Sequence, residues 1–86
     1  MRIFKYVLEL EPEQTINMHN INDGILSIQV QDDKVVMWAS VDPTSETAPQ
    51  KFIMVGTGHE IPVYNLMRYV DTVQLNGLVW HIFNVG

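Results

Sequence analysis

The segment Gly56-Thr57-Gly58-His59 has the residue types in this sequence that best suit binding of a small molecule. Two glycines let backbone N–H groups approach an anion closely, and the side chains of Thr57 and His59 add hydrogen-bonding groups. The segment lacks the lysine and the full glycine spacing of a phosphate-binding loop or a dinucleotide fingerprint. Two interpretations therefore stay open: a turn that binds a nucleotide or similar anion, and a plain β-turn or bulge in which glycine supplies a positive φ.

Residues suited to catalysis or metal binding form no recognisable pattern elsewhere. His19, His59 and His81 have neither helical spacing nor a second ligand nearby in the sequence, so we expect no metal site. The serines lack the turn chemistry that activates a nucleophile, and the carboxylates of Asp32-Asp33 fall at a predicted hairpin tip, where their role is conformational. We therefore predict no catalytic residues, no cofactor and no enzymatic activity.

The two tryptophans are the best candidates for contact with another protein, because aromatic anchors contribute disproportionately to binding. Trp80 has apolar neighbours, which favours a core position. Trp38 falls among polar residues on one face of a predicted strand, so both core packing and partner binding stay open for it. The long polar loop that follows starts at Asp42 and Pro43 and has no periodicity. We expect Trp38, Asp42 and Pro43 to share a partner-binding surface.

Length and composition predict a single domain over residues 1–86. The chain is 47% hydrophobic and 17% charged, and this apolar excess must be hidden in a core or against another subunit, so we expect a homo-oligomer. The absence of cysteine favours the cytosol. A net charge of −5 with scattered basic residues argues against nucleic-acid binding, and no apolar stretch reaches the length of a signal peptide or a membrane span.

Alternation of apolar and polar residues predicts β-strands along most of the chain, starting with residues 2–10. The clearest element is a hairpin over residues 24–41 with Asp32-Asp33 as its two-residue loop. Pairing Gln31 with Lys34 leaves Trp38 opposite Ser27 on the reverse of the sheet. The same register predicts an entirely apolar core face, which consists of Leu26, Ile28, Val30, Val35, Met37, Ala39 and Val41.

A second predicted hairpin turns at Asn76-Gly77, a sequence typical of a type I′ turn. Pairing Leu75 with Leu78 sets His81 opposite Thr72, whose hydroxyl can satisfy the imidazole ring. Both faces of this hairpin are largely apolar: one carries Tyr69, Val73, Trp80 and Ile82, and the other carries Val70, Val79, His81 and Phe83.

Prolines and glycines divide the rest of the chain. We expect breaks at residues 11–14 and 22–24, a strand over residues 51–55, and a short helix or irregular segment after Pro62, where Val63, Leu66, Met67 and Val70 have helical spacing. The predicted fold is all-β, with helix at most a minor part. Its architecture is a compact β-sandwich or partly open barrel of about six or seven short antiparallel strands.

Five segments taken together resemble a family of small proteins encoded mainly by bacteriophages and prophages and classed as a domain of unknown function. They are residues 24–29, 38–43, 56–59, 72–75 and 78–83, and the resemblance spans nearly the whole chain. It implies a phage origin and action in the host cytoplasm. The resemblance implies no catalytic residues, and it implies no role for residues 60–68.

These observations favour a non-enzymatic phage accessory protein that acts by binding and inhibits a host or defence protein. One alternative is a protein that sequesters a nucleotide or another small anionic ligand at residues 56–59. Another is a minor structural protein of the phage. No nucleic-acid or membrane partner is expected.

Overall fold

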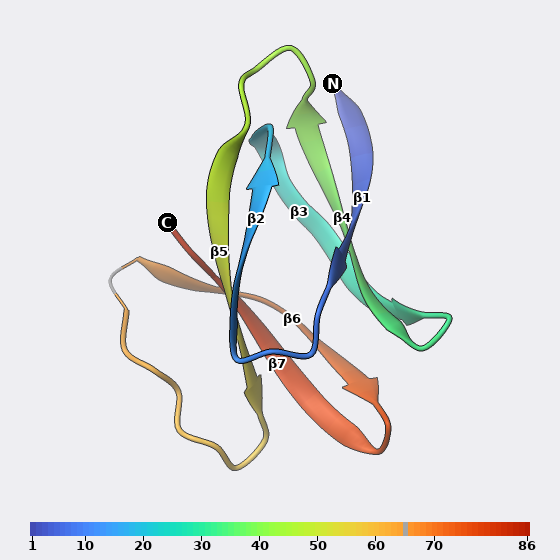
Figure 1. Cartoon of the computed structure of the whole chain (residues 1–86), viewed down its shortest axis with the longest axis vertical. Helices are drawn as coiled ribbons and strands as arrows, with labels where there is room; N and C mark the ends of the chain where they lie inside the picture. Colours follow the sequence, from blue (N-terminus) through green and yellow to red (C-terminus); the bar gives the residue numbers. More distant parts are fainter. Residues whose placement is uncertain (65) are drawn as a thin grey trace.

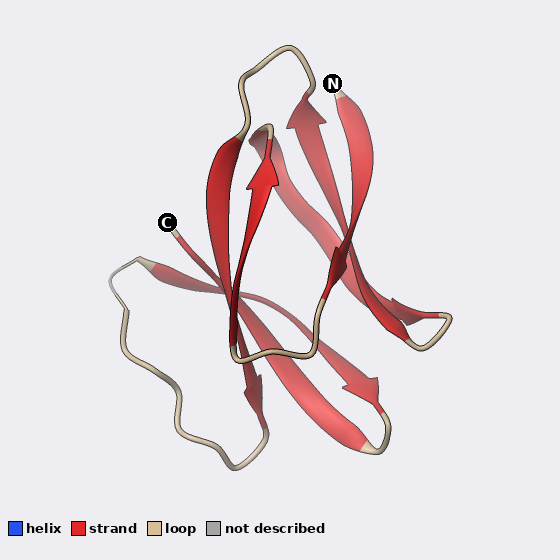
Figure 2. Cartoon of the chain, in the orientation of Figure 1, coloured by secondary structure: helices blue, strands red, loops and turns tan. Residues whose placement is uncertain are grey.

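The computed structural model describes residues 1–64 and 66–86, except for the side chains of residues 22 and 23. Within these residues the chain forms seven strands and no helix (Figure 2). The all-β prediction and the expected number of strands are therefore confirmed. The strands are β1 (Arg2–Leu8), β2 (Glu13–Met18), β3 (Asn20–Gln31), β4 (Lys34–Asp42), β5 (Ala48–Gly56), β6 (Met67–Leu75) and β7 (Leu78–Val85).

The strands form two antiparallel sheets that enclose one core (Figure 1). Sheet A has the order β1-β4-β3, and sheet B has the order β2-β5-β7-β6. The arrangement is an open sandwich rather than a closed barrel. Both sheets supply the core, with Met37 of β4 and Phe52 of β5 almost completely buried. Burying a side chain of this size contributes about 1.5–3 kcal/mol to folding.

The hairpin of β3 and β4 has the predicted turn and register. Asp32 and Asp33 both have positive φ, as a type I′ turn requires, and Gln31 pairs with Lys34. Trp38 lies opposite Ser27, also as predicted. The prediction that Leu26 faces the core is wrong, because a bulge between Ile25 and Ser27 shifts the alternation by one residue and leaves Leu26 51% exposed.

The hairpin of β6 and β7 also has its predicted turn, with positive φ at Asn76 and Gly77 and with Leu75 paired to Leu78. A bulge between Tyr69 and Asp71 changes the faces at the start of β6. Tyr69 was expected on the same face as Trp80 and instead packs edge-on against Phe83 on the outer face. Val70 was expected on that outer face and instead packs against the core.

Two other expected interruptions lie within β3 and before β6. The break at residues 22–24 is a bulge within β3, where Gly24 has a φ of 85°. Of the two forms expected after Pro62, the structure has the irregular segment and not the helix: residues 61–64 are irregular, Leu66 lies in a turn and β6 begins at Met67, while residue 65 lies outside the described residues. Among the described residues, no helix has the length and apolar character needed to cross a membrane.

Asp71 joins the two sheets at the β6 bulge. Its Oδ2 accepts a hydrogen bond from the backbone N–H of Ile28 in β3 at 2.9 Å, and its Oδ1 accepts one from the N–H of Thr72 at 2.8 Å. The carboxylate of β6 in sheet B therefore accepts a hydrogen bond from the backbone of β3, which is an edge strand of sheet A.

Candidate functional site

The segment Gly56 to His59 forms a tight turn at the end of β5. The N–H of His59 donates to the carbonyl of Gly56 at 3.0 Å, and the N–H of Thr57 donates to the carbonyl of Val79 at 3.1 Å. Gly58 has a φ of 90°, a conformation that glycine adopts without strain. Two of the amides on which the predicted anion site depends are therefore engaged within the protein.

The first glycine of this turn makes room for an imidazole ring. A Cβ atom at Gly56 would lie 3.1 Å from Nδ1 of His59 and 3.5 Å from the indole ring of Trp80. The His59 ring thus folds back over the end of β5, although the residue is exposed. A larger residue at position 56 would therefore require the His59 ring to shift.

All four residues of the predicted binding turn line a pocket of about 300 Å³ on the outer face of sheet B, which we call the turn pocket. Strands β5, β6 and β7 supply part of its lining, and the segment after β5 supplies the rest. The lining consists of Val55, Gly56, Thr57, Gly58, His59, Ile61, Tyr69, His81 and Phe83. Sequence reasoning found the turn but not the five other residues, which come from three strands and a loop.

A chain of hydrogen bonds fixes His81 at one side of the turn pocket. Its Nδ1 lies 3.0 Å from the hydroxyl of Thr72, as the predicted cross-strand pair required, and its Nε2 lies 2.8 Å from the hydroxyl of Thr57. The Tyr69 hydroxyl continues the chain to Thr72 at 2.6 Å. Both imidazole nitrogens have partners, so the ring orientation is set.

The segment after the turn is held against sheet B by three side chains, which we call the Tyr64 clamp. The Tyr64 hydroxyl donates to Glu13 Oε2 at 2.7 Å, Lys51 Nζ lies 2.7 Å from Glu13 Oε1, and Lys51 Nζ lies 4.6 Å from the centre of the Tyr64 ring. The hydrogen bonds from Lys51 and then Tyr64 lower the pKa of Glu13. The hydrogen bond to Glu13 raises the pKa of Lys51 and likewise that of Tyr64.

The predicted partner-binding residue Trp38 lies on the outer face of sheet A. Lys5 of β1 and Ser27 of β3 flank it, and its side chain is partly buried. We call this surface the Trp38 face and define it by seven outward side chains of β1 and β4, as far as Ser40. They are Ile3, Lys5, Val7, Lys34, Val36, Trp38 and Ser40.

Apolar and cationic groups alternate on the Trp38 face. Ile3 is 62% exposed and Val7 is 46% exposed, although both belong to a regular strand. The Lys5 ammonium donates to Gln31 Oε1 at 3.0 Å. Because Lys5 and Gln31 lie on the two strands that flank β4, this hydrogen bond crosses the outward side of β4, where Val36 is almost fully buried.

Asp42 and Pro43 lie at one end of the Trp38 face. Asp42 Oδ1 accepts hydrogen bonds from the hydroxyl and the N–H of Thr44, and these lower the pKa of Asp42. Ser45 connects the same loop to β3, because its hydroxyl accepts from the N–H of Asn20 at 2.8 Å. Asp42 follows Trp38 by four residues in β4, about 13 Å along an extended strand, so one partner can span both.

Comparison with known proteins gives a family but no function. A family model described as "Domain of unknown function (DUF7352)" matches residues 1–86. No curated protein and no solved structure matches the chain. Within the described residues, no group of three or more histidine, aspartate or glutamate side chains is placed to hold a metal ion.

Proposed function

We propose that this chain, which belongs to the DUF7352 family of domains of unknown function, is a non-enzymatic binding protein that uses the Trp38 face to contact a protein partner. The observation that carries the proposal is the exposure of Ile3 and Val7 beside Trp38 on a regular sheet face. Soluble domains normally leave such a face polar, and apolar side chains gathered there are typical of an interaction site.

The charges of the Trp38 face indicate the kind of partner. Lys5 and Lys34 are two of only five basic residues in a chain of net charge −5. Both are outward residues of sheet A, whereas the one carboxylate of β4, that of Asp42 at the end of the face, already accepts two hydrogen bonds from Thr44. A partner that presents an apolar patch bordered by carboxylates complements this surface.

The position of β1 at the edge of sheet A also supports a protein contact at this face. It pairs with β4 alone, so its second edge has no strand neighbour within the described residues. Ile3 and Val7 belong to this strand, which places the exposed apolar groups beside an edge open to main-chain pairing. The resemblance to phage and prophage proteins supports a partner in the host cytoplasm, such as a host or defence protein whose activity is blocked by binding.

Single substitutions on β1 test the proposal without disturbing the core. The partner is first captured from lysate of an infected host and purified, and its affinity is then measured for the native chain and for Ile3→Glu and Val7→Glu. Each variant adds a carboxylate to an exposed position, so both should weaken binding at least tenfold. Leu78→Glu is the matched control, because Leu78 is 55% exposed and lies in sheet B.

Equal affinity of the native chain, the two β1 variants and the control would contradict the proposal. So would self-association through this face: a native dimer that Val7→Glu separates into monomers would assign the surface to a second copy of the chain. Analytical ultracentrifugation of the native chain and the variants distinguishes this homo-oligomer from the proposed complex.

A further inference from the structure

The turn pocket is built from sequence-distant parts that the fold holds in place. Val55 lies at its base and is only 6% exposed, although it points away from the core between the sheets. Tyr69 and Phe83 form an edge-to-face aromatic pair beside it, with ring centres 5.8 Å apart. Ile61, 53% exposed, supplies the opposite side from the segment between β5 and β6, which Figure 1 shows as a wide excursion.

Two sets of hydrogen bonds preorganise this pocket. The Tyr64 clamp ties the segment that carries Ile61 to β2 and β5. The chain from Tyr69 through Thr72 and His81 to Thr57 fixes the polar groups on the other side. A site held in this way loses little conformational entropy when a ligand enters.

The chemistry of the lining excludes some ligands. No lysine or arginine is among the nine lining residues, and the N–H groups of Thr57 and His59 are used inside the turn. An anion would therefore lose its hydration without gaining a cationic partner, in a chain of net charge −5. Aromatic and aliphatic walls with a few hydrogen-bonding groups suit a flat, neutral molecule.

We propose that the turn pocket binds a neutral heteroaromatic molecule of one or two rings, which stacks between Tyr69, Phe83 and Ile61 and forms a hydrogen bond with the Thr57 hydroxyl. A pocket of about 300 Å³ is at the small end of ligand sites, and this size matches such a molecule. The site lies on sheet B, so it does not depend on the Trp38 face of sheet A.

Indole and indole-3-carboxylate are a matched pair of probes for this site, because they share a ring system and differ in charge. Titration of the isotopically labelled chain with each probe is followed by NMR. We expect indole to shift the signals of Val55, Tyr69, His81 and Phe83, and we expect the carboxylate to bind at least tenfold more weakly. Absence of shifts at millimolar indole, shifts elsewhere on the surface, or equal binding of the carboxylate would overturn the proposal.

A charge substitution at the rim tests the reason for this selectivity. Ile61→Lys places an ammonium group at an exposed lining position and should raise the affinity for indole-3-carboxylate relative to indole by at least fivefold. Val63→Lys adds the same charge to the same segment at a residue that is 96% exposed and does not line the pocket, so it should leave the ratio unchanged. An equal change of the ratio in both variants would assign the effect to net charge and overturn the proposed site.

Discussion

Replacing Asp71 by alanine should destabilise the protein substantially, although the Asp71 side chain is partly exposed. The substitution removes the acceptor for the N–H of Ile28 and for the N–H of Thr72. A hydrogen bond to a charged group contributes about 1.5–3 kcal/mol net, and an unpaired, partly buried N–H costs about 1–3 kcal/mol. The Thr72 N–H lies next to its acceptor in the sequence and is easily hydrated, so the Ile28 bond dominates. We expect a loss of about 2–4 kcal/mol.

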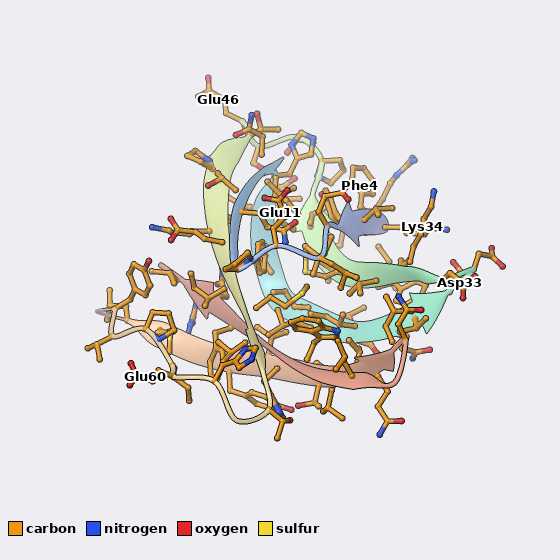
Figure 3. All side chains as sticks on the ribbon, turned by 60° about the horizontal axis from the view of Figure 1, so that its bottom comes forward. Phe4, Glu11, Asp33, Lys34, Glu46 and Glu60 are labelled. Atoms are coloured by element: carbon orange, nitrogen blue, oxygen red, sulfur yellow. The ribbon has the colours of Figure 1, made fainter. Side chains whose placement is uncertain are left out.

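This loss is a large part of the total stability. A chain of this length has about 4–13 kcal/mol of unfolding free energy. Urea unfolding followed by tryptophan fluorescence should show the midpoint falling by about 2 M or more, if the slope is near 1 kcal/mol per M. Asp71→Asn keeps a carbonyl oxygen and should lose about half as much. Glu46→Ala is the control, since Glu46 projects from the loop between β4 and β5 (Figure 3).

Amide hydrogen exchange at Ile28 is a second measurement of this loss of stability. In Asp71→Ala the N–H of Ile28 should lose protection by about 30-fold or more, because about 2 kcal/mol corresponds to that factor. A destabilisation below about 0.5 kcal/mol, or unchanged protection at Ile28, would refute the role assigned to this carboxylate.

Two further predictions concern the clamp and the core. Because the pKa of Glu13 is lowered, the Tyr64 clamp stabilises the fold above the ordinary glutamate pKa, and this stability is lost as the pH falls through the lowered pKa. Because the pKa values of Lys51 and Tyr64 are raised, the stability that the clamp contributes is also lost as the pH rises through these raised pKa values. NMR titration of the Glu13 carboxyl should show a higher pKa in Tyr64→Phe, and an unchanged pKa would show that the hydroxyl has no such effect. The indole N–H of Trp80 is the one buried side-chain polar group without a hydrogen-bond partner among the described residues. Trp80→Phe removes this N–H, which offsets the loss of apolar contact, so the free energy of unfolding should change by no more than about 1 kcal/mol. A loss above about 3 kcal/mol in thermal unfolding would contradict that balance.

The sequence predicts the turns of this fold better than the faces of its strands. Asp32-Asp33 and Asn76-Gly77 define both hairpins, because few residues adopt positive φ at two successive positions. Leu26 and Tyr69 were assigned to the wrong face because each adjoins a bulge, and one extra residue reverses the alternation beyond it. Gly24, which lies between the two bulges of β3, is a sequence signal of this irregularity, but a glycine there predicts a break as readily as a bulge.

In the candidate sites too, features set by local sequence were predictable and features set by long-range packing were not. Local patterns indicated the Gly56 to His59 turn and the pair of Thr72 with His81, since each depends on neighbouring residues or on one hairpin register. Ile61 and Tyr64 carried no signal, because their roles arise from a loop that folds back onto β2 and β5. The exposure of Ile3 and Val7 also had no signal, since an alternating strand gives no indication of which face another sheet covers.

Hydrogen exchange of the chain with and without its purified partner tests the Trp38 face most directly. We predict that the partner slows exchange of the amides in β1 and β4 and leaves those in β6 and β7 unchanged. Protection confined to β6, β7 and the turn at Gly56 to His59, with none on β1 or β4, would contradict the proposed contact surface.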